Sequence, residues 1–190
     1  AFPSGFAGMI HDRTEGNPLF MADVLRDLRR RQIIVQQDGR WATTEHVSAI
    51  AREMPESIRS LIQRKMDALD DADRRLLAAA SVQGMDFDSA IAAAVVQSGE
   101  EEVESRLDRL EREHALVRFV GELEAPDRTL TLHYRFAHHM YQNAFFESLR
   151  ATRKAALGRA VAERLAARYG EQTERLADIA VLFEVARDGV

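Results

Sequence analysis

The stretch Tyr134-Arg135-Phe136-Ala137-His138-His139-Met140-Tyr141 decides the fold, because a strand pattern ends and a helix pattern begins within it. Upstream, apolar and polar residues alternate, which predicts a strand. One face of this strand holds Leu130, Leu132, Tyr134 and Phe136, and its other face holds Thr129, Thr131, His133 and Arg135. Downstream, Met140 to Leu149 carries apolar residues at the spacing of a helix buried on one side. His138 stands at the junction, where the free N–H groups of a helix start can receive an anion, so it is the first candidate functional residue.

Composition restricts the function classes. The 190 residues have 26 basic and 31 acidic side chains, so the net charge of -5 gives no overall attraction for nucleic acid. The absence of cysteine excludes disulfides, thiolate catalysis and cysteine zinc sites. No apolar run approaches the ~20 residues of a membrane span, and we expect a cytoplasmic protein without membrane contact. Neither lysine, Lys65 or Lys154, follows a glycine, so this chain contains no Gly-Lys-Ser/Thr phosphate-binding loop.

The first part of the chain, residues 1–50, reads as helices with one hairpin. A short helix is predicted within residues 3–14, and a second from Pro18 to about Arg31, with Asn17 as its N-cap. Two short strands around Asp38-Gly39 predict a β-hairpin with a two-residue turn. The residues that follow, 45–54, show no clear period and are read as a linker or a short helical turn.

The second part, residues 55–149, has the order of a winged helix. A helix is predicted from Pro55, and another follows Asp70 as N-cap and ends at Gly84. A short helix over residues 89–97 precedes Ser98-Gly99-Glu100-Glu101, which fits a capping box for the next helix. Two strands, residues 115–120 and 129–136, then predict a hairpin. Helices followed by a two-stranded wing are typical of this variant of helix-turn-helix.

The last part, residues 150–190, predicts a helical hairpin. One helix covers residues 152–169, Gly170 breaks it, and a final amphipathic helix includes Leu176 and Phe183. A lone pair of this kind buries too little apolar surface, so we expect it to begin a helical-repeat array in a longer protein. The predicted fold class is therefore mostly α with two small β-hairpins: a helical lid, a winged-helix domain and a C-terminal helical hairpin.

Four segments together resemble the part of a signal-transduction P-loop ATPase that follows its nucleotide-binding core. They are Gly16-Asn17-Pro18-Leu19-Phe20, Pro55-Glu56-Ser57-Ile58-Arg59, Phe87, and Arg135-Phe136-Ala137-His138 through Phe146-Glu147-Ser148-Leu149. The resemblance is to the bacterial regulators in which a nucleotide-binding domain precedes a helical lid, a winged helix and tetratricopeptide-like repeats, and it spans essentially the whole chain. It implies that Gly16, Asn17 and Pro18 contact adenine and that His138 reaches the β-phosphate of ADP. Related proteins read Met-His-Asp where this chain reads Ala137-His138-His139, so only the central position carries over.

The resemblance implies a regulatory, non-catalytic portion of an ATP-dependent signalling or transcriptional regulator, acting as a nucleotide-state switch and interdomain relay. ADP or ATP would be bound in the parent protein, and this chain alone would hold neither tightly. Its partners would be the parent's own nucleotide-binding domain and helical repeats. Purely structural roles remain the alternative for both sites: a helix start at Asn17-Pro18, and an N-cap or packed histidine at His138.

The residues allow three other interpretations: DNA reading, a metal site and hydrolase activity. A winged helix that reads DNA is the main alternative, but residues 100–113 carry seven acids against three arginines, which opposes docking on a polyanion. A metal site at His133, His138 and His139 is not expected, because adjacent helix residues diverge and no acid or histidine follows at the i+4 position. An autonomous hydrolase lacks a cysteine nucleophile and a Gly-x-Ser-x-Gly elbow, so we expect no enzyme activity from this chain alone.

Overall fold

The structure, a computed structural model of the chain, describes residues 2, 4–37, 40–44, 56–126 and 128–169. It is mostly helical with two small antiparallel sheets, which confirms the predicted mostly α class. Contacts divide the chain into two compact units, residues 1–65 and 66–190. In the described ranges, no helix is both long and apolar enough to cross a membrane. Predictions for the Asp38-Gly39 turn, residues 45–55 and residues 170–190 lie outside the described residues.

The first unit pairs two helices with a hairpin. Helix α1 covers Phe6–Thr14 and α2 covers Pro18–Arg30, and the strands β1 (Ile34–Gln37) and β2 (Arg40–Thr43) pair antiparallel. Their buried side chains form a small apolar core: Phe6, Ile10, Phe20, Val24, Leu28, Ile33 and Ile34. Helix α4 (Glu56–Asp67) crosses the boundary between the units and buries Ile58, Ile62 and Met66, the face predicted from its period.

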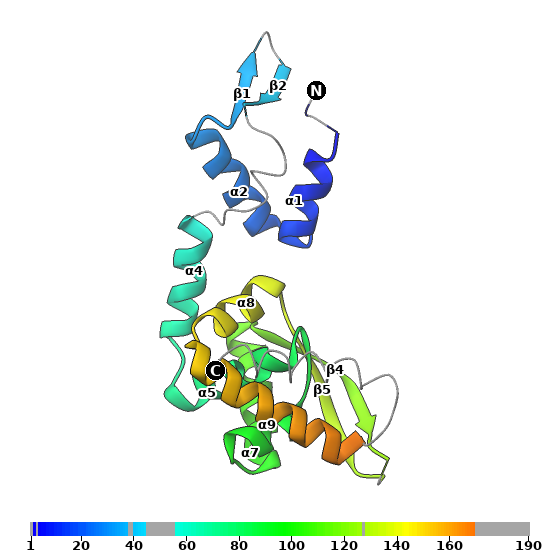
Figure 1. The fold of residues 1–190 in the computed structure, drawn as a ribbon. Coiled ribbons are helices and arrows are strands. Elements are labelled where there is room, and N and C mark those ends of the chain that lie inside the picture. Colours follow the sequence, from blue (N-terminus) through cyan, green and yellow to red (C-terminus); the bar gives the residue numbers. More distant parts are fainter. Residues whose placement is uncertain (1, 3, 38–39, 45–55, 127, 170–190) are drawn as a thin grey trace. The chain divides into compact units, whose positions relative to one another are not determined.

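The second unit alternates helices and short strands (Figure 1). Helix α5 is Asp71–Gln83, β3 is Asp86–Asp88, α6 is Ser89–Val96, and α7 is Glu100–Arg109, continued by a π-helical turn, η1, at Leu110–His114. Strands β4 (Val117–Glu124) and β5 (Leu130–Phe136) precede α8 (His139–Glu147) and α9 (Ala151–Tyr169). The predicted caps of α5 are present. The Asp70 carboxylate accepts the Asp73 N–H at 2.7 Å, and Gly84 ends the helix at φ +118°.

The sheet of the second unit has the strand order β3-β5-β4. Sequence analysis predicted only the β4–β5 hairpin of this sheet and missed β3. That strand is three residues long, which is too short for an alternation of apolar and polar residues to be recognised. Register places Phe87, Tyr134 and Phe119 side by side across the three strands. The Phe87 and Tyr134 rings stack with centroids 6.0 Å apart, so β3 completes an aromatic row.

Burial does not follow one face of β5 throughout. Tyr134 and Phe136 are buried, but Leu130 on the same face is 62% exposed, and Thr131 on the other face is 1% exposed. The reason is a polar contact that periodicity does not include: the Thr131 hydroxyl donates to the Asp88 carboxylate at 2.6 Å. Helix α6 packs against this end of β5, so the threonine side is covered.

Asp88 joins four elements through one buried carboxylate. Its Oδ1 accepts the backbone N–H groups of Ala90 and Ile91, which caps α6, and also accepts the Thr131 hydroxyl of β5. Its Oδ2 accepts the Tyr169 hydroxyl at 2.5 Å, at the last residue of α9. A carboxylate supplied with several donors is satisfied while buried, so it holds β3, α6, β5 and α9 together.

Helix α9 shares a core with α5 and α6. Its inward residues Leu157, Val161 and Leu165 pack with Ala79, Val82 and Ile91 in one apolar cluster. Gly158 is also buried in this helix. The described part of residues 150–190 is therefore fixed on the second unit by both apolar packing and the Tyr169 hydrogen bond.

We expect Asp88→Ala to lower the free energy of unfolding by about 3 kcal/mol, because it removes the α6 cap and leaves two buried hydroxyls without their acceptor. Tyr169→Phe removes one bond to the carboxylate and should cost about 1.5–3 kcal/mol. Urea unfolding followed by circular dichroism measures both. The control is Asp86→Ala, two residues earlier, where a partly exposed pair with Arg135 is lost and the cost should stay below about 1 kcal/mol. Equal losses in Asp86→Ala and Asp88→Ala would contradict the role given to Asp88.

Candidate functional site

His138 occupies the turn between β5 and α8. Its backbone is extended, with φ −160° and ψ 143°, and its Nδ1 accepts the Met140 N–H at 3.1 Å as the N-cap of α8. The side chain is 2% exposed and contacts the His139 ring, with centroids 4.5 Å apart. The structural role that sequence analysis kept open for this residue is therefore present.

The backbone that leads to His138 is held on both sides. Phe136 N donates to Met85 O and Ala137 N donates to Leu116 O, each at 2.9 Å. Because Nδ1 is an acceptor here, the neutral imidazole carries its proton on Nε2. The turn thus fixes both the position of the ring and its tautomer, with a donor nitrogen on the side opposite the helix cap.

Gly16, Asn17 and Pro18 form the turn between α1 and α2 in the first unit. Gly16 has φ +71°, a conformation that a residue with a Cβ adopts only with strain. Asn17 accepts the Phe20 N–H through Oδ1 at 3.4 Å, and Pro18 begins α2, as predicted for a cap and a first helical residue. These three residues belong to the first unit and His138 belongs to the second.

A charged cluster between α5 and α7 was missed by the sequence reasoning. Arg106 donates to Asp73 at 2.9 Å and Arg109 donates to Asp73 at 2.5 Å, and both arginines also contact Asp70. The hydrogen bond to Asp73 is the main cause that raises the pKa of each guanidinium. The backbone bond from Asp73, assisted by Arg106, lowers the pKa of the Asp70 carboxyl. The sequence does contain two acids and two arginines at the same spacing, Asp70 with Asp73 and Arg106 with Arg109. It does not indicate, however, that α5 and α7 pack against each other.

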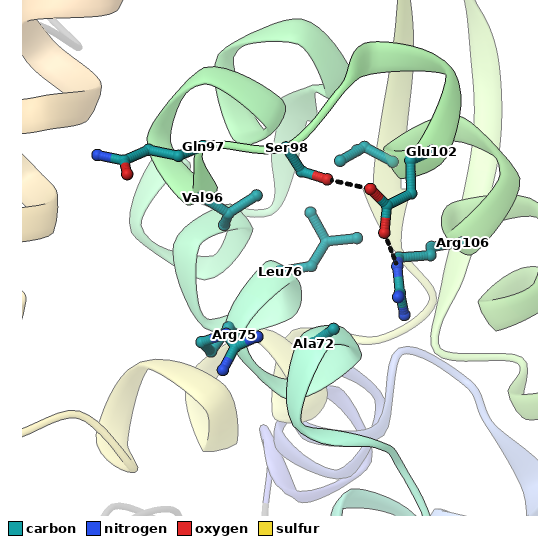
Figure 2. A pocket seen from close by; sticks show the side chains of 9 residues that line it. Ala72, Arg75, Leu76, Val96, Gln97, Ser98, Glu102 and Arg106 are labelled. Carbon is teal, nitrogen blue, oxygen red and sulfur yellow. Dashed lines mark hydrogen bonds and ion pairs between the residues drawn. The ribbon is translucent and has the colours of Figure 1, made fainter.

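The capping box predicted at Ser98 is wrong. Gly99 is the N-cap of α7 and makes no side-chain cap bond, whereas the Ser98 hydroxyl donates to Glu102 at 2.7 Å. Glu102 in turn accepts from Arg106 at 3.1 Å, so the serine begins a chain of side-chain bonds along the helix (Figure 2). The helix begins one residue later than the box requires, which places Ser98 outside the cap position.

A small pocket lies beside this chain of bonds, between α5 and the start of α7 (Figure 2). Its lining includes Ala72, Arg75, Leu76, Gln97 and Val103. The volume of about 180 Å³ is below the roughly 300–1,000 Å³ that drug-sized ligands occupy. The pocket has a mixed lining and room for a few water molecules, not for a nucleotide.

The two sides of α7 differ in charge. One side presents Arg106 and Arg109 to the carboxylates of α5. The other side carries Glu100, Glu104 and Asp108, which follow each other at four-residue spacing. Partial burial, followed by repulsion from Glu100 and Asp108, raises the pKa of the Glu104 carboxyl. Two of the three arginines counted in residues 100–113, Arg106 and Arg109, are thus paired with Asp73 within the unit.

Comparison with known proteins adds no relative. No protein-family model and no curated protein matches this sequence.

We expect Asp73→Ala to destabilise the second unit by about 2–3 kcal/mol, because Asp73 is buried and accepts from both Arg106 and Arg109. The measurement is chemical unfolding of the whole chain. Asp71→Ala is the matched control: it also lies in the first turn of α5, but its carboxylate is 79% exposed and pairs only with Arg74 in the described structure. That change should cost less than about 1 kcal/mol. A loss in the control as large as in Asp73→Ala would show that the α5–α7 cluster adds nothing specific.

We expect Glu104→Gln to raise the free energy of unfolding at neutral pH by a few tenths of a kcal/mol, the size of like-charge repulsion between helix neighbours. The sign follows from linkage: a carboxyl whose pKa is raised by folding favours the folded state at low pH, and this contribution is lost as pH rises through its folded pKa. The gain should therefore vanish below about pH 4, the ordinary range of a glutamate pKa, where both forms are neutral. Urea unfolding at a series of pH values measures it. A gain that persists at low pH would refute repulsion as the cause.

Proposed function

We propose that this chain is the regulatory portion of a larger ATP-dependent signalling or transcriptional regulator, and that it acts as a nucleotide-state switch and interdomain relay. The observation that supports this proposal is the position of His138 and the contacts of its ring. The ring is buried at a helix start, the two residues before it each donate a backbone hydrogen bond, and Nδ1 is used as the cap. That arrangement presents Nε2–H, which is the form of histidine that donates to a phosphate oxygen.

The second unit supports the proposal by its topology. Its elements follow the order α5, β3, α6, α7, β4, β5, and the sheet order β3-β5-β4 brings the hairpin back beside the first strand. We interpret this arrangement as the winged helix expected between residues 55 and 149. Helix α9, which packs on the same core, would be the first element of the helical repeats. It would transmit a movement of the winged unit to those repeats.

The nucleotide would be ADP or ATP in the parent protein, not a tightly held ligand of this chain. In the parent, Gly16, Asn17 and Pro18 would contact adenine and His138 would reach the β-phosphate of ADP. A separate nucleotide-binding domain would supply the phosphate-binding loop, so this portion would itself be non-catalytic. Closure would then depend on ADP, since a ligand favours the state in which its contacts are better.

DNA reading by the winged helix is the alternative function, and the charges of α7 disfavour it. The segment 100–113 has seven acids and three arginines, a balance of 3 − 7 = −4. Arg106 and Arg109 donate to Asp73, so their charges are already paired within the protein and would have to leave Asp73 to contact a DNA phosphate. Because phosphate contacts supply most non-specific affinity for DNA, this helix repels the backbone that it would have to approach.

We expect His138→Asn and His138→Ala to weaken ADP binding by the full-length parent by about 1.5–3 kcal/mol, the contribution of one charge-assisted hydrogen bond. Both changes should also raise basal activity, because the closed state loses a contact. Asparagine is a good N-cap, so His138→Asn should keep the thermal stability that His138→Ala loses. ADP titration calorimetry and thermal unfolding together separate the two roles.

His139→Asn is the matched control, because it changes the adjacent histidine, the first residue of α8. It should leave ADP affinity nearly unchanged. If His138→Asn binds ADP as the unaltered parent does, His138 is only a helix cap and the proposed nucleotide contact is refuted.

A further inference from the structure

Strand β4 leaves an apolar edge uncovered in the second unit. Phe119 and Val120 are 46% and 51% exposed, and β4 is an outer strand of the sheet. Phe119 ends the aromatic row: its ring meets Tyr134 edge-on with centroids 5.6 Å apart. Val120 lies at the β-bulge between Phe119 and Gly121. Large apolar side chains that remain exposed together on an edge strand are typical of an interaction surface.

Carboxylates of α7 and η1 border this apolar edge. Asp108 accepts the Tyr134 hydroxyl at 3.0 Å, and Glu111 accepts the Phe119 N–H at 3.2 Å. Glu104 lies one helical turn before Asp108, and its charge also acts on the Tyr134 hydroxyl. We refer to Phe119, Val120, Glu104, Asp108 and Glu111 together as the acidic–aromatic edge.

The negative charge of this edge is not neutralised by the neighbouring arginines. Arg106 and Arg109 face α5, where they pair with Asp73. Arg118 is the register partner of Arg135 and lies on the sheet face opposite Phe119, because successive strand residues alternate. Within the described part of the chain, no ion pair involves Glu104, Asp108 or Glu111. Partial burial is the main cause that raises the pKa of Glu104, and repulsion from Glu100 and Asp108 adds to it.

We propose that the acidic–aromatic edge docks an arginine-containing segment of a partner polypeptide. A guanidinium group is planar, so it can stack on the exposed Phe119 ring while it donates to a carboxylate through two N–H groups. An apolar side chain next to that arginine would cover Val120. Lysine offers a point charge without the stacking surface and should bind less well.

Two other occupants fit the edge less well. A second strand added to β4 would need the outward N–H of Phe119, which already donates to Glu111, and the bulge at Val120 disturbs the pairing. Nucleic acid is disfavoured by the three carboxylates. The docking inference does not depend on the nucleotide role proposed above, because none of its residues belongs to the predicted nucleotide contacts.

The test is fluorescence anisotropy with the whole chain and a short labelled peptide in which arginine alternates with leucine. We expect saturable binding that weakens as salt rises, since exposed charges are screened. The same peptide with lysine in place of arginine should bind several-fold more weakly, and one with glutamate should not bind. If the arginine peptide binds no better than the glutamate peptide, the proposal is wrong.

Variants of the edge locate the binding. Glu104→Gln combined with Glu111→Gln should weaken the arginine peptide about three- to tenfold, because two exposed ion pairs are lost while the amide oxygens still accept their hydrogen bonds. Phe119→Ser should weaken it by a similar factor, and Val120→Ser provides a second apolar change if Phe119→Ser lowers the melting temperature. Glu163→Gln, an exposed residue of α9, removes the same charge elsewhere and should leave binding unchanged.

Three results would overturn the proposal. The first is equal binding by the edge variants and by Glu163→Gln, which would indicate non-specific attraction to an acidic protein. The second is direct binding of labelled duplex DNA by the peptide-free chain that Phe119→Ser weakens, which would make the surface a nucleic-acid site. The third is that the chain without peptide sediments as a dimer and the Phe119→Ser variant as a monomer. A second copy of the chain would then be the occupant of the edge.

Discussion

The carboxylate of Asp88 connects four elements of the second unit. One oxygen accepts two backbone N–H groups of α6 and the Thr131 hydroxyl, and the other accepts the hydroxyl of Tyr169. Burying a carboxylate is unfavourable unless its lone pairs are filled, and here they are filled by three different elements of the fold. The group therefore acts as a geometric constraint: β3, α6, β5 and α9 have to meet at one point before the charge is satisfied.

That constraint bears on how His138 could act in a switch. Strand β5 ends at Phe136, its other end is fixed through Thr131 to Asp88, and α8 starts at the ring of His138. A force on the imidazole would act on β5, which is hydrogen-bonded to both β3 and β4. Through Thr131 and Asp88 it would reach Tyr169, the last residue of α9. Under the proposed function the unit would move as a rigid body, because the groups that connect the histidine to α9 are packed and satisfied.

The sequence predicted elements well and contacts between elements poorly. Period and capping residues gave α2, α5 and α8 with their starts at Asn17, Asp70 and His138, because these signals are local in the chain. Strand β3 was missed since three residues carry no period, and the burial of Thr131 was missed because Asp88 lies 43 positions away. The Asp73 pairing with Arg106 and Arg109 was hidden for the same reason: it depends on which helices pack, and charge along a single helix does not encode that. Of the candidate site, the local geometry of Gly16, Asn17, Pro18 and His138 was predictable, whereas their action on a nucleotide stays a prediction.

The two-sided charge of α7 links these observations. If its arginines faced solvent, the helix could approach a phosphate backbone, as a recognition helix of a DNA reader does. Instead Asp73 holds Arg106 and Arg109 against α5, and this pairing leaves Glu104, Asp108 and Glu111 to determine the field on the side next to Phe119. The buried aspartate at position 73 thus joins α5 to α7 and holds Arg106 and Arg109 on the side of α7 away from Glu104 and Asp108.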